Sequence, residues 1–431
     1  MKLADVFCDG MVLQREREIC VFGSGVGNGN IEFCGTRTQF AANGDFRVYL
    51  PAQEAGGPYE MKITLDDEAV VINDILIGDV YLAAGQSNMA LTLGEVGETD
   101  IVESQGVRYF REPHFPDDKL VPYLDARGWE KCTRENAGGF SAVAYYFAVK
   151  LNSETGIPVG IVSCNIGAST VDAWTSPEVI READYRKLLE IRHNDYFDYP
   201  FNQNCWLYEN KLRHLIPFAF SGVRWYQGES DRRLEDARNY DKLLSALIDD
   251  WRGRWNDEMP FYCVQLMPHN EGDPTSSWAA LREAQEHLTK HKPKTYLVTL
   301  FNTGEADNIH PTKKRGLGEA LARAVLNVQF GCATEYCGPV SERFTLAEGC
   351  LRIEFSHAEG LRFEGAPRDV MLIGSDGAET PADCCVEGNS LLVRLAADTR
   401  VVALGYKNAP EHNLYNSDGY LASPFKYDLT E

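Results

Sequence analysis

The sequence predicts an α/β fold: a parallel sheet flanked by helices, with accessory all-β regions at both ends. Two observations support this fold class. From about residue 75 to 330, short apolar runs alternate with longer amphipathic stretches, an order typical of a parallel sheet covered on both faces. On either side, short segments of alternating polarity are separated by Gly, Asn and Asp, which indicates strands and turns. We therefore expect an N-terminal β-sandwich-like region (1–74), a central α/β domain (75–330) and a C-terminal β region (331–431).

The individual elements follow these patterns along the chain. In the N-terminal region, the predicted strands are EICVFGSG, NIEFCG and FRVYLP. In the central region, apolar runs predict strands at 159–167, 222–228, 260–266 and 295–300. One helix is predicted where apolar residues recur at helical spacing, namely Leu244, Leu247, Ile248, Trp251 and Trp255. The stretch GGFSAVAYYFAVKL is typical of a buried helix face. Strand patterns return in GCLRIEFSH, DVMLIGSDG, NSLLVRLA and RVVALGY.

Charge and composition limit the classes of partner. The chain has 64 acidic and 42 basic residues, a formal net charge of -22, which disfavours nucleic acid and anionic membrane surfaces. The segment 1–15 lacks the apolar core of a secretory signal, and no run of about 18 apolar residues occurs. The twelve cysteines are scattered without a C-x-x-C pair, which fits a reducing compartment. We expect a cytoplasmic protein, and the sequence leaves its oligomeric state open.

The stretch GDVYLAAGQSNMALTL, residues 78–93, places Ser87 directly after a predicted strand. Gly, Ser and Asn are common in turns, so turn composition alone explains these residues. A serine hydroxyl is a weak nucleophile unless a base accepts its proton and another group orients that base. Ser87 is therefore a turn residue or a nucleophile, depending on the partners that the rest of the chain supplies.

Two further segments place suitable residues at strand ends. Gly167 closes VSCNIG, and Gln227 lies near the close of VRWYQG. Ligands of an open α/β sheet bind at the carboxyl ends of its strands, so these residues and Ser87 are expected at one site. The alternative is a turn glycine at position 167 and an amide that caps a sheet edge at position 227.

The candidate base is His310, in the segment EADNIHPTKKRG. Among the nine histidines, it alone has an aspartate three residues before it, Asp307. A carboxylate that accepts the imidazole N–H fixes the tautomer and leaves the other ring nitrogen to face a hydroxyl. Pro311 and Thr312 are suited to starting the next helix. The alternative is a helix-capping aspartate beside a surface histidine.

The blocks GQSNM, NIGAS, WYQGES and DNIHP together resemble those of the SGNH hydrolase superfamily, and within it the chain resembles the sialate O-acetylesterase family. Further segments similar to family signatures are FCDGMVLQR, VDAWTSPE, LIPFAFSGVRWYQGESD and NLYNSDGYLASPFKYD, which span nearly the whole chain. An α/β-hydrolase is excluded, because its serine lies in Gly-x-Ser-x-Gly and position 89 here is Met.

The resemblance implies a role for each residue. Ser87 would attack the acetyl carbonyl, His310 would accept its proton and later protonate the leaving sugar oxygen, and Asp307 would orient His310. The oxyanion would be held by the backbone N–H groups of Ser87 and Gly167 and by the side-chain amide of Gln227. The chain departs from the superfamily pattern at position 227, where the superfamily name refers to an asparagine.

Three further residues are candidate substrate contacts: Asn88, Trp174 and Glu229. Trp174 and Trp225 could stack on a sugar ring or could be buried core residues. Glu229 and Asp231 are separated by one residue, which argues against a glycosidase pair flanking a scissile bond. Glu229 could instead hydrogen-bond the loops of the site.

The sequence therefore predicts a serine esterase that removes O-acetyl groups from carbohydrate, with sialic acid as the expected substrate and no metal or other cofactor. Two alternatives remain. One is an acetylesterase acting on plant polysaccharides such as xylan, and the other is a carbohydrate-binding protein whose serine site is inert. The stretch NLYNSDGYLASPF could shape the substrate pocket or only support the fold.

Overall fold

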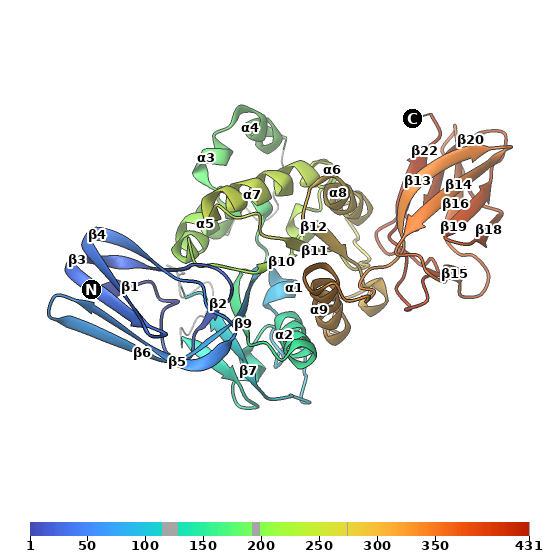
Figure 1. Ribbon diagram of the computed structural model, residues 1–431. Coiled ribbons are helices and arrows are strands. Elements are labelled where there is room, and N and C mark those ends of the chain that lie inside the picture. Colours follow the sequence, from blue (N-terminus) through green and yellow to red (C-terminus); the bar gives the residue numbers. More distant parts are fainter. Residues whose placement is uncertain (114–127, 192–198, 274, 431) are drawn as a thin grey trace. The chain divides into compact units, whose positions relative to one another are not determined.

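The computed structural model describes residues 1–113, 128–191, 199–273 and 275–430. The chain divides into two compact units. The first comprises Met1–Glu190, Asp195–Gln227 and Leu243–Tyr262, and the second Ile191–Asn194, Gly228–Lys242 and Cys263–Glu431. Strands and helices alternate through the centre of the chain, and strands dominate its two ends (Figure 1). The predicted fold class is confirmed.

The elements of the first unit begin with an all-β part. Its strands and helices are β1 (Lys2–Leu3), β2 (Val12–Gln14), β3 (Ile19–Phe33), β4 (Thr36–Leu50), β5 (Gly56–Leu65), β6 (Glu68–Gly85), α1 (Ser87–Ala90), β7 (Ser104–Arg111), β8 (Trp129–Cys132), α2 (Ala142–Thr155), β9 (Val159–Asn165), α3 (Pro177–Ile180), α4 (Ala183–Glu190), α5 (Trp206–Asn210) and β10 (Gly222–Tyr226). Two elements, α7 (Tyr240–Trp255) and β11 (Phe261–Val264), begin in one unit and end in the other.

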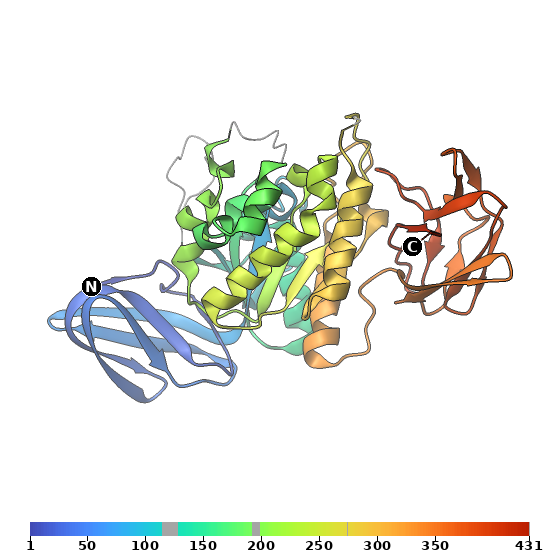
Figure 2. The ribbon, with the colours of Figure 1, turned by 90° about the horizontal axis from the view of Figure 1, so that it is seen from above.

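The N-terminal β part contains one long hairpin, β3 and β4, seen in blue in Figure 2. The prediction of EICVFGSG and NIEFCG as separate strands is wrong, because both belong to β3. The Gly- and Asn-rich residues 23–30 have turn composition, but each pairs with a residue of β4 between positions 39 and 46. Such cross-strand pairing outweighs weak local β-propensity. The hairpin turns at Cys34 and Gly35, which both have positive φ.

Strand β6 runs from this β part into the parallel sheet. Its first portion, Glu68 to Ile77, pairs antiparallel with β5. From Asp79 to Gly85 it pairs parallel with β9, and from Tyr81 to Gly85 parallel with β10. β7 adds a further parallel strand beside β9. The predicted change of pattern near residue 75 therefore lies inside one strand, close to the point where its partners change direction.

Helices cover both faces of the parallel strands in the first unit. On β10, the guanidinium of Arg224 lies 4.4 Å from the ring centroid of Phe147 on α2. The next residue, Trp225, packs edge-on against Trp251 of α7, with 5.7 Å between ring centroids. Because successive strand residues point to opposite faces, α2 and α7 lie on opposite faces of the sheet (Figure 1). The apolar residues that predicted α7 are all buried.

The second unit combines part of the α/β domain with the C-terminal β region. Its elements are α6 (Leu234–Arg238), α8 (Trp278–His291), β12 (Thr295–Val298), α9 (Arg315–Phe330), β13 (Val340–Ala347), β14 (Cys350–Ser356), β15 (Arg362–Phe363), β16 (Val370–Gly374), β17 (Glu379–Pro381), β18 (Cys384–Glu387), β19 (Ser390–Arg394), β20 (Thr399–Leu404), β21 (Leu414–Tyr415) and β22 (Phe425–Asp428). Each of the four C-terminal segments predicted as strands contains one, namely β14, β16, β19 and β20.

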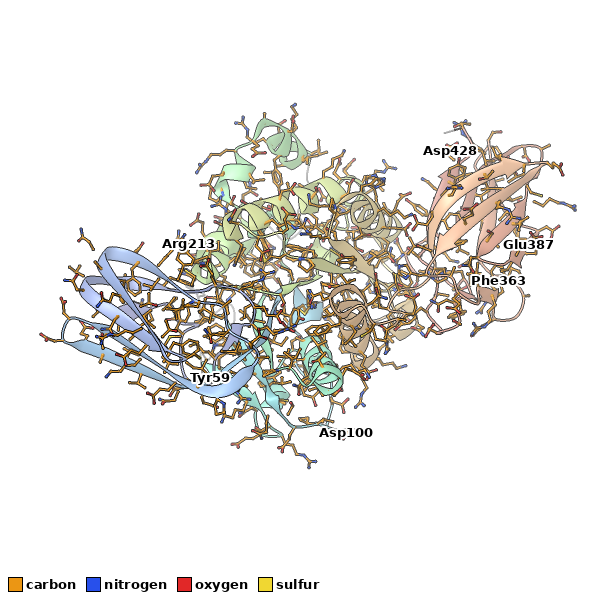
Figure 3. The ribbon with its side chains drawn as sticks, in the orientation of Figure 1. Tyr59, Asp100, Arg213, Phe363, Glu387 and Asp428 are labelled. Carbon is orange, nitrogen blue, oxygen red and sulfur yellow. The ribbon has the colours of Figure 1, made fainter. Side chains whose placement is uncertain are left out.

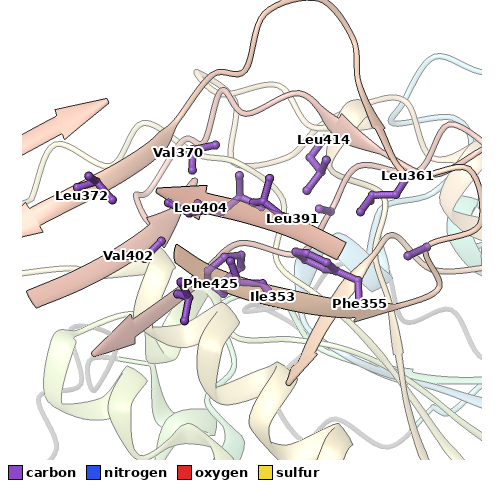
Figure 4. Close-up of a cluster of buried hydrophobic side chains, with 14 residues drawn as sticks. Ile353, Phe355, Leu361, Val370, Leu372, Leu391, Val402, Leu404, Leu414 and Phe425 are labelled. Carbon is purple, nitrogen blue, oxygen red and sulfur yellow. The ribbon is translucent and has the colours of Figure 1, made fainter. Parts of the chain in front are cut away.

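The C-terminal region contains two four-stranded sheets, in the orders β13-β14-β19-β18 and β17-β16-β20-β22, and the two-stranded sheet β15-β21. Both four-stranded sheets contribute to one buried apolar cluster, for example Ile353 and Leu391 from the first sheet and Val402 and Phe425 from the second (Figure 4). Polar residues lie outside this core. Glu387, labelled in Figure 3, pairs with Arg352 across the sheet at 2.8 Å. Among the described helices, none has the length and apolar character needed to cross a membrane.

Candidate active site

Ser87 follows the carboxyl end of β6 through a turn that requires glycine. Gly85 has φ of +131°, and a Cβ there would lie 2.1 Å from the carbonyl oxygen of Tyr226. Only glycine allows this approach of the two backbones. The N–H of Gln86 then donates to the same oxygen at 3.0 Å, and α1 begins with Ser87. The turn thus leaves Ser87 half-buried at the sheet edge.

The register of the parallel strands brings the first three predicted residues to one edge. Gly85 of β6 lies opposite Asn165 of β9 and Tyr226 of β10. Gly167 follows β9 and Gln227 follows β10, so both lie at the edge that carries Ser87. A Cβ placed on Gly167 would be 3.5 Å from the Cβ of Ser87. The structure therefore places Gly167 directly against Ser87.

The loop after Gly167 is held by three side chains. Gln227 is fully buried, and its Nε2 donates to the carbonyl oxygen of Ser169 at 2.9 Å. Asn202 donates from Nδ2 to the carbonyl oxygen of Ala168 at 2.7 Å, and its Oδ1 accepts from the N–H of Thr170 at 3.1 Å. These contacts fix the backbone that carries the Gly167 N–H. Asn202 is not among the site residues predicted from the sequence.

Trp174 is the third side chain that holds this loop. Its Nε1 donates to Ser169 Oγ at 3.0 Å, and its carbonyl oxygen accepts from Trp251 Nε1 at 3.1 Å. The side chains of Trp174 and Trp225 have exposed fractions of 0%. This burial favours the packing alternative for both. Asn88, the remaining candidate of this unit, is 2% exposed and follows Ser87 on α1.

Asp307 and His310 lie in the second unit, on a loop closed by Glu305. Glu305 Oε1 accepts from the N–H and the hydroxyl of Thr312 at 3.1 and 2.9 Å, and Oε2 accepts from Asn308 Nδ2 at 3.0 Å. Asn308 Oδ1 in turn accepts from the N–H of His310 at 3.0 Å. The pKa of Glu305 is lowered by these donors, first by that of Asn308. Asp307 and His310 are both exposed, and a contact between their side chains stays a prediction.

The helix after this loop begins later than predicted. Pro311 and Thr312 were expected to start it, but α9 begins at Arg315. The hydroxyl and the N–H of Thr312 bind Glu305, so they close the loop instead of capping the helix. The loop is therefore longer on the C-terminal side of His310 than the sequence indicated.

Glu229 and Lys314 form a buried charged group in the second unit. Glu229 is 2% exposed and Lys314 is 3% exposed. Burial lowers the pKa of Lys314 to about 8, while the carboxylates of Glu229 and Glu305 act in the opposite direction. Lys314 lies four residues after His310, and Glu229 lies two residues after Gln227. This arrangement supports the alternative in which Glu229 holds the loops of the site.

Comparison with known proteins gives the same assignment as the motifs. The family profile described as "Carbohydrate esterase, sialic acid-specific acetylesterase" matches residues 77–327. The chain belongs to this family. The matched range contains every candidate site residue from Ser87 to His310. Members of this carbohydrate esterase family hydrolyse carboxylic esters, and the chain is a carboxylic ester hydrolase acting on O-acetyl groups.

Relatives of this esterase cover most of the chain. Sialate O-acetylesterase of Homo sapiens is 26% identical over 359 residues, which cover 74% of this chain and 68% of the human protein. Sialate O-acetylesterase of Mus musculus is 24% identical, over 72% of this chain and 68% of its own length. The crystal structure of a carbohydrate acetylesterase from Xanthomonas citri is 31% identical, with a TM-score of 0.88 over 99% of both chains.

Proposed function

We propose that the esterase removes acetyl groups from O-acetylated sialic acid through an acetyl-enzyme intermediate on Ser87. The observation that carries this proposal is the sheet register, which puts Ser87 against Gly167 at the carboxyl edge of β6, β9 and β10. The sialate O-acetylesterases among its relatives support the substrate.

The reaction has two halves. Ser87 Oγ attacks the acetyl carbonyl carbon while His310 accepts the hydroxyl proton, and a tetrahedral oxyanion forms. The bond from this carbon to the sugar oxygen then breaks, and His310 gives its proton to that oxygen. In the second half, water attacks the acetyl carbon as His310 accepts one of its protons. The bond from this carbon to Ser87 Oγ then breaks, His310 returns the proton to Oγ, and acetic acid leaves and ionises to acetate. Asp307 orients His310 and stabilises its charged form.

The oxyanion needs donors that are fixed before the reaction begins. The backbone N–H groups of Ser87 and Gly167 and the Nε2 of Gln227 have this role in the proposal. An amide nitrogen carries two hydrogens, so Nε2 can bind the oxyanion while it keeps its bond to Ser169. The rigid support of residues 168–170 means that little reorganisation is needed when charge develops.

Active-site labelling tests the proposal without assuming a substrate. An organophosphonate should modify Ser87, as identified by peptide mass, and should leave folded Ser87→Ala protein unlabelled. Acetate release is then compared for 9-O-acetylated sialic acid and acetylated xylan. Release from the sialic acid confirms the proposed substrate. Release from xylan alone keeps the nucleophile and overturns the substrate, and a folded protein that is not labelled overturns the esterase mechanism.

Gln227→Ala should lower kcat by about a hundredfold or more, because one donor to the oxyanion is lost. Gln227→Asn is the matched control, since it keeps an amide at the position where the superfamily name refers to asparagine, and it should retain more turnover. Steady-state kinetics of acetate release measure both variants, with circular dichroism to verify folding. If folded Gln227→Ala protein turns over as fast as the parent, Gln227 does not bind the oxyanion.

A further inference from the structure

A second loop of the second unit contacts the loop that carries Asp307. Asn270 Nδ2 donates to Asp307 Oδ1 at 2.7 Å, and the N–H of Asn270 donates to the carbonyl oxygen of Ala306 at 2.6 Å. Gly304 lies against the same loop, since a Cβ there would be 2.7 Å from Pro268 Cδ. Residues 268–270 and 304–307 therefore run side by side and are joined at the carboxylate of Asp307.

The C-terminal β region fixes the loop that carries Asn270. Arg282 is fully buried, and it donates from Nε to the carbonyl oxygen of Leu266 at 2.8 Å and from Nη1 to that of Lys407 at 3.0 Å. The carbonyl oxygen of Asn408 accepts from the N–H of His269 at 3.2 Å. The residue directly before Asn270 is thus held by a strand-to-strand connection of the C-terminal region.

The stretch NLYNSDGYLASPF, from Asn413 to Phe425, has a similar supporting role. Ser423 Oγ accepts from Gln265 Nε2 at 2.9 Å, at the start of the segment that leads to Asn270. Asn416 Nδ2 donates to the carbonyl oxygens of Cys337 and His357 at 3.1 and 3.0 Å. Ser423 and Asn416 are buried, so these contacts favour support of the fold over direct contact with substrate.

We propose that Asn270 is a positioning residue that holds the carboxylate of Asp307 in the orientation His310 requires. The inference rests on the proposed roles of Asp307 and His310. A carboxylate has two oxygens, and the Asn270 amide binds Oδ1, so that Oδ2 can accept the imidazole N–H. Asp307 is exposed, and without this bond its side chain would exchange among staggered rotamers.

Asn270→Ala tests this role through kcat. We expect kcat to fall about tenfold, as for the loss of one hydrogen bond to a charged group, with KM within about twofold of the parent. The bond is exposed, so the unfolding temperature should stay the same. Asn270→Gln keeps a donor and should recover part of the loss. Asn239→Ala is the matched control, a half-buried asparagine of the same unit that donates to the Glu235 carbonyl oxygen.

Asn270→Asp tests whether position 270 lies close enough to Asp307 and His310 to act on the imidazole. It places a second negative charge beside Asp307, and negative charge near an imidazole favours its protonated form. In the proposed mechanism kcat/KM rises with pH as His310 loses its proton, because only the neutral imidazole can accept the proton of Ser87. The midpoint of this rise should therefore move to higher pH in Asn270→Asp. A midpoint that stays in place, in folded protein, would overturn the positioning role.

A double-mutant cycle distinguishes a failure of the role proposed for Asn270 from a failure of the proposed triad. In an Asp307→Asn background, Asn270→Ala should lower kcat by less than about a further twofold, because the carboxylate that Asn270 holds is already absent. If the reductions in kcat of the two single variants multiply in the double variant, Asn270 acts independently of Asp307. If Asp307→Asn is impaired and Asn270→Ala is not, this inference alone fails. If Asp307→Asn is as active as the parent, the proposed triad fails.

Discussion

Ser87→Ala should lower kcat for acetate release from acetylated sialic acid on the order of 10⁶-fold, because the proposed reaction has no other nucleophile. The substitution removes one hydroxyl and leaves the backbone of α1 intact, including the bond from the N–H of Leu91 to the carbonyl oxygen of Ser87 at 2.8 Å. Folding should therefore be unaffected. The measurement is acetate release at saturating substrate, with the unfolding temperature recorded for the same preparation.

Ser153→Ala is the matched control for this prediction. Ser153 is an exposed serine on α2 whose hydroxyl donates to the carbonyl oxygen of Lys150 at 2.7 Å, so its loss should not affect turnover. Ser87→Ala protein that retains turnover within about a hundredfold of the parent would mean that Ser87 is not the nucleophile.

Asp307→Asn should lower kcat on the order of 10⁴-fold, because an amide can present its NH₂ group to the imidazole and stabilise the wrong tautomer. Asp307 is exposed and accepts a hydrogen bond from the amide of Asn270, so the substitution should leave the fold unchanged. The measurement is kcat across a range of pH, because this distinguishes the loss of His310 as a base from a change in the pH at which it acts.

Asp376→Asn provides the comparison for Asp307→Asn. Asp376 is an exposed aspartate of the same unit, and its Oδ1 accepts from the N–H of Ala378 at 2.9 Å. The kcat of this variant should equal that of the parent. An Asp307→Asn protein of parental activity would remove Asp307 from the mechanism, although Ser87 could still be the nucleophile.

The sequence predicted those parts of the site that depend on local pattern. Ser87, Gly167 and Gln227 each follow an apolar run, and parallel register then brings such positions to one edge. The continuous strand β3 was missed because its Gly-rich centre is stabilised by partners in β4 and not by its own propensity.

The supporting residues could not be predicted because their partners are distant in sequence. Asn202 is 32 residues from Thr170, and Asn270 is 37 residues from Asp307. A single asparagine in a loop has no periodicity and no flanking motif that would distinguish it from a turn residue. The late start of α9 has the same origin, since Thr312 bonds to Glu305, seven residues earlier, instead of capping the helix.

Strand β6 also limits how this enzyme could be recombined with its relatives. One backbone segment, Glu68–Gly85, completes the N-terminal β part and delivers the turn to Ser87. Removing residues 1–74 would cut this strand, strip away β2 and β5, and expose Ile75 and Ile77, which are 0% and 1% exposed. The N-terminal region is therefore not an exchangeable module. A chimaera of two family members should be active only if β6 and its partner strands all come from the same parent sequence.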